Sequence, residues 1–217
     1  MKTRILLVDD HKLMRDGLRA LLEKHSHLEV IGEAPNGRLA VELTARLKPD
    51  VVIMDVTMPD MNGIEATRRI VGESERIKII ALSMHADRRF VAEMLNAGVA
   101  GYLLKDCAYE ELVQALHTVM ADQTYLSPVI AGILVEDYKT RLSKPRTLDP
   151  SPLTPREREA LQLLAEGKAT KTIASMLKVS DKTIETYRQQ IMKKLNLHSV
   201  AQLTKYALRE GLTSLEI

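Results

Sequence analysis

Short apolar runs alternate with amphipathic stretches through the first 121 residues, and this alternation restricts the fold more than any other feature. The apolar runs predict strands at residues 4–8, 28–34, 50–54, 78–83 and 100–104. The amphipathic stretches predict helices at about residues 12–24, 38–48, 63–73, 88–97 and 108–121. The runs are nearly continuous in valine, isoleucine and leucine, as in strands covered by helices on both faces; only the second is interrupted, by Glu29 and Glu33. The pattern therefore predicts an α/β fold with a five-stranded, doubly wound parallel sheet in the order 2-1-3-4-5.

Polar side chains follow four of these strands at their C-terminal ends. They are Asp9 and Asp10, Asp55, Ser83 and Lys105. In a parallel sheet such strand ends line one crevice, where ligands usually bind. Taken singly, each has a simpler explanation, because an aspartate after a strand often caps a helix and a lysine is usually solvated. Their occurrence together, in order along the chain, favours a common site.

The carboxylates in this set suit a hard divalent cation. Mg2+ prefers oxygen ligands and retains several waters, so that one or two carboxylates suffice to hold it. We expect Asp10 and Asp55 to bind Mg2+ directly, Asp9 to act through water, and the backbone carbonyl near Thr57 to complete the protein's share.

The other groups suit phosphoryl transfer. The Asp55 carboxylate could attack phosphorus and form an aspartyl phosphate, which makes it the predicted phosphoacceptor. Lys105 would contact the phosphoryl oxygens as a point charge, and the Ser83 hydroxyl would hydrogen-bond another of them.

Charge and cysteine usage indicate two tasks in a reducing compartment. Residues 1–127 contain 16 basic and 19 acidic residues, whereas residues 151–217 contain 11 and 7. The basic tail is therefore the candidate for binding nucleic acid. Cys107 is the single cysteine, which rules out an internal disulfide. The apolar run near the N-terminus is too short for a signal peptide or a membrane span, and we expect a cytoplasmic protein.

The chain is expected to have three parts. They are a first domain at residues 1–122, a linker at 123–150 and a second domain at 151–217. Within the linker, Ser127 and Pro128 predict the start of a helix at residues 128–142. The stretch from Ser143 to Pro152 contains three prolines and predicts a hinge whose stiffness they set.

The tail is predicted to be helical throughout. Thr154 and Glu157 form the pattern of a capping box, which opens a helix that ends near Gly167. Further helices are expected at about residues 171–177, 181–195 and 199–210. This spacing is typical of a helix-turn-helix with one supporting helix on each side.

Residues 181–195 form the predicted recognition helix of this motif. Ile184, Ile191 and Leu195 would pack against the neighbouring helices. The side chains expected to reach base edges in the major groove are Glu185, Thr186 and Gln189. Those expected to contact phosphates, and so to set affinity and its salt dependence, are Lys182, Thr183, Arg188 and Lys193.

Residues 4–121 resemble the receiver domains of bacterial two-component response regulators. The resemblance rests on Asp9-Asp10, on the stretch from Asp55 to Gly63, on Ala81-Leu82-Ser83 and on the stretch from Gly101 to Lys105. It implies that Asp55 accepts phosphate from a histidine kinase and that Ser83 and Tyr102 move together when it does. It also implies that Thr57 and His85 tune the lifetime of the phosphate, and Thr57 is a less common residue at its position.

The tail is similar to the LuxR-type helix-turn-helix. The matching stretches are Leu153 to Glu159, Ile173-Ala174, Val179-Ser180, Thr183 to Glu185 and Met192 to Leu195. Ala169, Thr170, Thr172 and Tyr187 depart from the commoner residues, close to expected phosphate contacts. Together the two resemblances indicate the NarL/FixJ class of response regulators.

These resemblances imply a transcription regulator that binds double-stranded promoter DNA, as a homodimer when a sensor histidine kinase has phosphorylated it. Such a protein is not a conventional enzyme, although its receiver catalyses its own Mg2+-dependent phosphotransfer and dephosphorylation. One alternative is a phosphatase of the haloacid dehalogenase type. That class has the motif Asp-x-Asp after its first strand, whereas the candidate nucleophile of this chain, Asp55, follows the third strand. The others are a helix-turn-helix regulator switched by a small ligand and an inactive receiver that works through protein contacts alone.

Overall fold

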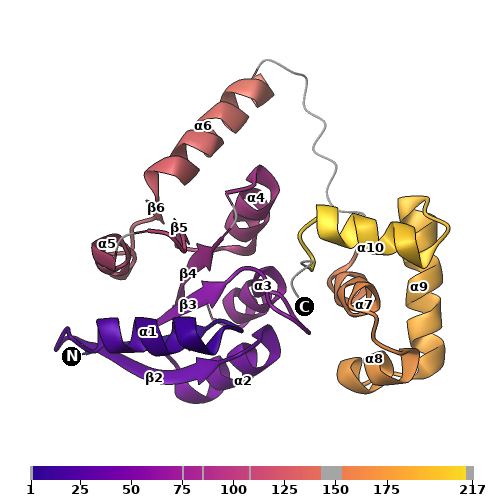
Figure 1. The fold of residues 1–217 in the computed structure, drawn as a ribbon, viewed down its shortest axis with the longest axis horizontal. Helices are drawn as coiled ribbons and strands as arrows, with labels where there is room; N and C mark the ends of the chain where they lie inside the picture. Colours follow the sequence, from indigo (N-terminus) through magenta and orange to yellow (C-terminus); the bar gives the residue numbers. More distant parts are fainter. Residues whose placement is uncertain (1, 75, 85, 108, 143–152, 214–217) are drawn as a thin grey trace. The chain divides into compact units, whose positions relative to one another are not determined.

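The structure, a computed structural model, describes residues 2–74, 76–84, 86–107, 109–142 and 153–213. The chain divides into two compact units, Met1–Pro145 and Arg146–Ile217 (Figure 1). Among the described residues, no helix is both long and apolar enough to span a bilayer.

The first unit alternates strands and helices around a parallel sheet. Its strands are β1 (Thr3–Val8), β2 (Leu28–Ala34), β3 (Val51–Asp55), β4 (Lys78–Ser83), β5 (Gly101–Leu104) and β6 (Tyr125–Leu126). Its helices are α1 (Lys12–Leu22), α2 (Gly37–Leu47), α3 (Gly63–Glu73), α4 (Arg88–Ala97), α5 (Tyr109–Met120) and α6 (Pro128–Leu142). The strand order is β2-β1-β3-β4-β5-β6, which contains the predicted order 2-1-3-4-5. The doubly wound parallel fold is therefore confirmed.

The expectation of five strands was wrong by one. Tyr125 and Leu126 add a sixth strand, which pairs in parallel with Gly101 and Tyr102 of β5. A strand of two residues is too short to show an alternation of apolar and polar residues in the sequence. These two residues become a strand because the chain returns from α5 along the edge of β5, where the Tyr125 amide donates to the Ala100 carbonyl at 3.0 Å.

After residue 122, β6 and the buried side of α6 pack with the first unit. We expected a linker at residues 123–150, but β6 extends the sheet and α6 covers part of the core. Ile130 of α6 is fully buried and belongs to the same apolar cluster as Tyr102. The bounds of α6 match the helix expected at residues 128–142. The predicted hinge at residues 143–152 lies outside the described residues.

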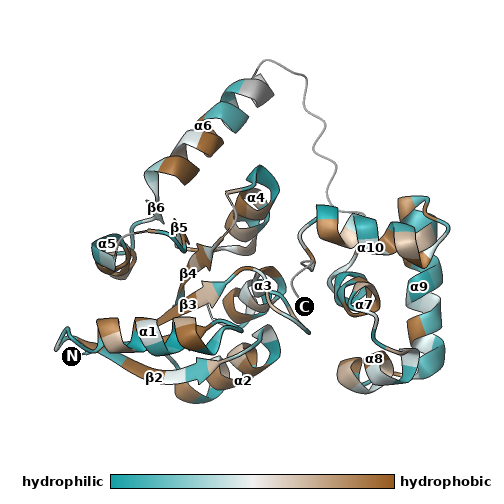
Figure 2. Cartoon of the chain, in the orientation of Figure 1, coloured by the Kyte–Doolittle hydropathy of each residue, from teal (hydrophilic) through white to brown (hydrophobic). Residues whose placement is uncertain are grey.

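Alternation along the strands gives the sheet two apolar faces. Leu6 and Val8 belong to a cluster with buried side chains of α2, α3, α4 and α6. Ile5 and Leu7 point to the opposite face and pack with buried side chains of α1 and α5. Figure 2 shows β3 and β4 as largely hydrophobic, as expected for central strands that helices cover on both faces.

The second unit contains only helices among its described residues. They are α7 (Pro155–Ala165), α8 (Thr170–Leu177), α9 (Asp181–Leu195) and α10 (Val200–Arg209). The capping box is present, because Thr154 Oγ1 accepts from the Glu157 amide and Glu157 Oε2 accepts from the Thr154 amide. Lys178 takes a left-handed conformation at the end of α8 and turns the chain into α9. This unit therefore has the predicted helix-turn-helix between two supporting helices.

Candidate functional site

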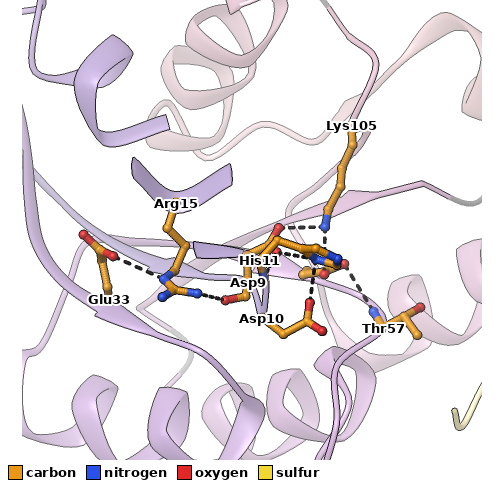
Figure 3. Close-up of polar contacts among 8 residues, drawn as sticks. Asp9, Asp10, His11, Arg15, Glu33, Thr57 and Lys105 are labelled. Atoms are coloured by element: carbon orange, nitrogen blue, oxygen red, sulfur yellow. Dashed lines mark hydrogen bonds and ion pairs between the residues drawn. The ribbon is translucent and has the colours of Figure 1, made fainter. Parts of the chain in front are cut away.

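Three of the predicted strand-end residues form one buried ion cluster. Lys105 Nζ lies 2.6 Å from Asp9 Oδ2 and 2.8 Å from Asp55 Oδ2 (Figure 3). Both carboxylates are buried, and only 4% of the lysine side chain is exposed. Asp9 follows β1, Asp55 ends β3 and Lys105 follows β5, so the parallel sheet brings together residues far apart in sequence.

The two aspartates after β1 do not act as helix caps. The N-cap of α1 is His11, and no side-chain hydrogen bond caps this helix. Asp9 Oδ1 instead accepts from the His11 amide at 2.8 Å, which holds the carboxylate at the strand end. The simpler explanation of Asp9 and Asp10 as capping residues therefore fails.

Two residues that the sequence did not single out support this strand end. Arg15 Nη1 donates to the Asp9 carbonyl at 2.6 Å, and Arg15 Nε lies 3.2 Å from Glu33 Oε2 (Figure 3). Glu33 is one of the two charges that interrupt the apolar run of β2. The sequence could have pointed to Glu33 through this interruption, because a half-buried charge inside a strand needs a partner.

The electrostatics of the cluster follow from its burial. Burial raises the pKa of Asp55 to about 6; Asp9 adds to this effect, while Lys105 and the Thr57 amide oppose it. Burial by itself would lower the pKa of Lys105, but Asp55 and Asp9 outweigh it and raise that pKa. Lys105 is therefore a fixed positive charge, and Asp55 ionises close to neutral pH. Such perturbed groups in one crevice are typical of functional sites.

The neighbouring oxygens fit a divalent cation. Ligand atoms of Asp9, Asp10, His11 and Asp55 all lie within 4.8 Å of one another. Asp10 Oδ1 is buried, and His11 Nδ1 approaches it at 2.9 Å. Three carboxylates gathered in one crevice are a donor set that suits a hard dication. The Thr57 amide donates to Asp55 Oδ1 at 3.3 Å, while its carbonyl remains a predicted ligand.

The two residues expected to move together lie in contact. Ser83 and Tyr102 are buried, and their side chains are hydrogen-bonded to each other. Burial raises the pKa of Tyr102 to about 12, so the phenol keeps its proton. The Tyr102 carbonyl accepts from the Ser127 amide at 3.0 Å, which connects this residue to the start of α6. His85 lies outside the described residues.

The predicted DNA contacts all lie on α9. Its exposed members are Lys182, Thr186, Gln189 and Lys193, and its half-buried members are Thr183, Glu185 and Arg188. Ile184 and Ile191 are buried on the opposite side, as expected for a packed face. Glu185 Oε1 accepts from Thr170 Oγ1 at 3.3 Å, so this side chain also joins α9 to α8.

Comparisons with known proteins agree with both units. Residues 5–117 match the family model of the response regulator receiver domain, and residues 151–207 match that of the bacterial regulatory proteins of the luxR family. The transcriptional regulatory protein MctR of Rhizobium johnstonii is 38% identical over 213 residues, covering 98% of this chain and 96% of MctR. The response regulator UvrY of Escherichia coli K12 is 37% identical over 213 residues, with the same coverage of 98% and 96%.

Solved structures give the same result. RcsB from Salmonella enterica serovar Typhimurium, bound to promoter rprA with the phosphomimetic BeF3-, matches with a TM-score of 0.61 and 26% identity, covering 95% of this chain and 98% of that chain. A LuxR-family two-component response regulator from Aurantimonas sp. SI85-9A1 matches with a TM-score of 0.62 and 37% identity, covering 64% of this chain and 99% of that chain.

The matched regions account for both units. The receiver model covers more than half of the chain, and the curated relatives align over almost all of it. These relatives are regulators, so the comparisons do not support the phosphatase or the ligand-switched alternative. The chain belongs to the two-component response regulators of the NarL/FixJ class, in which a receiver domain precedes a LuxR-type DNA-binding domain.

Proposed function

We propose that Asp55 accepts a phosphoryl group from a sensor histidine kinase and that its phosphorylation controls the binding of α9 to promoter DNA. The observation that carries this proposal is the buried Lys105 ammonium between Asp9 and Asp55, at 2.6 and 2.8 Å. A buried lysine held by two carboxylates at the strand ends is poised to contact the oxygens of a group bound to Asp55. The DNA target implies that the protein works in the cytoplasm.

The transfer step follows from the charges at the site. An Asp55 carboxylate oxygen attacks phosphorus, the bond from phosphorus to the kinase histidine breaks, and its electron pair leaves with the imidazole nitrogen. With a pKa of about 6, Asp55 is mostly ionised above pH 7 and available as the nucleophile. Mg2+ held by Asp10, Asp55, the Thr57 carbonyl and, through water, Asp9 would offset the charge of the incoming phosphoryl oxygens.

Lys105 and Ser83 act on the transferred group. The ammonium contacts phosphoryl oxygens and the Ser83 hydroxyl donates a hydrogen bond to one of them, which lowers the energy of the charged transition state. Dephosphorylation is a separate step: water attacks phosphorus, the bond to the Asp55 oxygen breaks, and inorganic phosphate leaves while the carboxylate is restored. Thr57 and His85 are proposed to set how readily that water reaches phosphorus.

Phosphorylation of Asp55 can be tested directly. The wild type, incubated with Mg2+ and acetyl phosphate, is expected to gain one phosphoryl adduct by intact mass, whereas Asp55→Asn gains none because it lacks the nucleophile. Asp16→Asn, which removes an exposed carboxylate of α1, serves as the matched control and should behave as the wild type. An adduct on Asp55→Asn at the wild-type level, or a folded wild type that gains no adduct from acetyl phosphate or from a kinase, would contradict the proposal.

Contacts of the described residues suggest how the signal leaves the site. Ser83 is proposed to turn toward the phosphoryl group, and Tyr102 to follow because the two side chains are hydrogen-bonded. The backbone of Tyr102 pairs with β6, and Arg88 at the start of α4 forms an ion pair with buried Asp137 of α6. A shift of Tyr102 would therefore change how α6 and α4 pack. We propose that this promotes dimerisation; the solved structures include two RcsB dimers bound to two parallel DNAs.

The exposed face of α9 can be tested by the salt dependence of DNA binding. Lys193→Ala is expected to weaken binding about equally on all DNA sequences and to reduce the slope of log Kd against log salt by about 1, because one phosphate contact is lost. Gln189→Ala should instead lose about 1–3 kcal/mol on the preferred site and little on random DNA.

Fluorescence anisotropy with a fragment selected from a random pool, and with unselected DNA, measures both effects in phosphorylated protein. Lys24→Ala, an exposed lysine of the first unit, is the control. The assignment of α9 is wrong if Lys193→Ala leaves the slope unchanged and Gln189→Ala leaves selectivity unchanged.

A further inference from the structure

The imidazole of His11 lies at the acidic site and could serve as a nitrogen ligand to a metal ion, but the proposed phosphotransfer does not use it. His11 Nδ1 lies 2.9 Å from Asp10 Oδ1 and 3.2 Å from Asp9 Oδ1 (Figure 3). The Nδ1 edge of the ring therefore contacts the carboxylates, although 63% of the side chain is exposed. His11 is also the N-cap residue of α1, yet its side chain makes no capping bond. Its imidazole is held by the site itself.

The spacing suits a shared metal ion. Ligand atoms of Asp9, Asp10, His11 and Asp55 all lie within 4.8 Å of one another. Two ligands at roughly 2.1 Å from one ion can lie at most about 4.2 Å apart, so small side-chain rotations bring all four onto a single ion. Lys105 contacts the Oδ2 atoms of Asp9 and Asp55. His11 approaches the other carboxylate oxygen of Asp9, Oδ1, so the two residues do not compete for the same atom.

The chemistry of this donor set depends on the metal. Mg2+ is a hard ion that binds oxygen and keeps its waters, so it gains little from an imidazole. First-row transition-metal dications such as Ni2+ bind imidazole well, and their affinity for a mixed nitrogen and oxygen site rises along the series toward Cu2+. An imidazole nitrogen beside three carboxylates therefore favours these ions over Mg2+ more than carboxylates alone would.

We infer that His11 is a metal-selectivity residue: it supplies a nitrogen ligand to first-row transition-metal dications at the acidic site and leaves the binding of Mg2+ nearly unchanged. This inference rests on the proposed function, since it concerns the same site. Because both kinds of ion compete for Asp10 and Asp55, phosphorylation of this protein would respond to the ratio of transition metal to Mg2+.

Competition calorimetry on the full chain tests the inference. Ni2+ is titrated at pH 7.5 with and without saturating Mg2+, and the component of Ni2+ binding that Mg2+ displaces belongs to the acidic site. His11→Asn is expected to weaken that component by about tenfold or more, because it removes one nitrogen ligand, and to change the affinity for Mg2+ less than about threefold.

Four other histidines provide controls. His25, His27 and His117 form a cluster of aromatic rings in the first unit. Replacing these three with asparagine should leave the Mg2+-displaceable component unchanged, as should His198→Asn in the second unit. The inference is overturned if His11→Asn leaves Ni2+ affinity unchanged, if it weakens Ni2+ and Mg2+ equally, or if the wild type has no Mg2+-displaceable Ni2+ component. The phosphoryl adduct on Asp55 is measured separately, so failure of the proposed function is distinguishable.

Discussion

An alanine at Gly63 is expected to destabilise the first unit severely, by about 3 kcal/mol or more. Gly63 is the first residue of α3, and a Cβ atom there would overlap the carbonyl oxygen of Asp55 and lie 3.0 Å from Met54 Cγ. The Asp55 carbonyl belongs to the backbone of β3, which is paired on both sides and cannot move without loss of sheet hydrogen bonds. The strain would therefore act directly on Asp55, the proposed phosphoacceptor.

The measurement is pulse proteolysis in urea, with peptides of β3 and β4 quantified by mass spectrometry. This readout follows the first unit within the full chain. Gly17→Ala is the matched control, because Gly17 lies in α1 and a Cβ atom there meets nothing within 4 Å. That variant should gain about 0.5–1 kcal/mol from helix propensity. Equal stability of the two variants would show that α3 does not approach Asp55 as closely as described.

Most of the sheet could be predicted because its strands are long enough to show a pattern. β4, α3, α4, α6 and α9 have the predicted bounds, and β2 formed despite its two glutamates because Leu28, Val30 and Ala34 still face the core. β6 could not be predicted, because two residues are too few to show a hydrophobic period. Their pairing with β5 depends on where the chain emerges from α5, which the sequence does not show. The same holds for the place of α6, whose apolar residues predict a helix but not the surface it covers.

The site was predictable to the extent that parallel strand ends converge. That rule brings Asp9, Asp55 and Lys105 together, but it does not show that Lys105 contacts Asp9 as well as Asp55. Helical periodicity has a similar limit on α9. It places Glu185 on the outward side, whereas the hydrogen bond from Thr170 of α8 holds it half-buried. Partners on another element are not visible in the pattern of one element.

The ionisation of Asp55 is expected to make the first unit less stable as pH rises from about 4 to 6. Burial gives Asp55 a folded-state pKa of about 6, above its ordinary value of 3.8. Between these values the folded chain binds more protons than the unfolded chain, so the free energy of unfolding falls with rising pH. The stabilisation is present below the unfolded pKa and is lost as pH passes the folded pKa. At 1.36 kcal/mol per pKa unit, the loss amounts to about 3 kcal/mol above pH 7.

Asp55→Asn removes this titration, so in EDTA it should become more stable than the wild type as pH rises. The difference in unfolding free energy should grow by about 2 kcal/mol between pH 4.5 and 7.5, measured by the same proteolysis of β3 and β4 peptides. Asp16→Asn, which removes an exposed carboxylate of α1 outside the Lys105 cluster, is the matched control. Added Mg2+ should stabilise the wild type at pH 7.5 more than it stabilises Asp55→Asn, because we propose that it binds the ionised carboxylate of the folded state. A pH-independent difference for Asp55→Asn would mean that Lys105 fully compensates the buried charge.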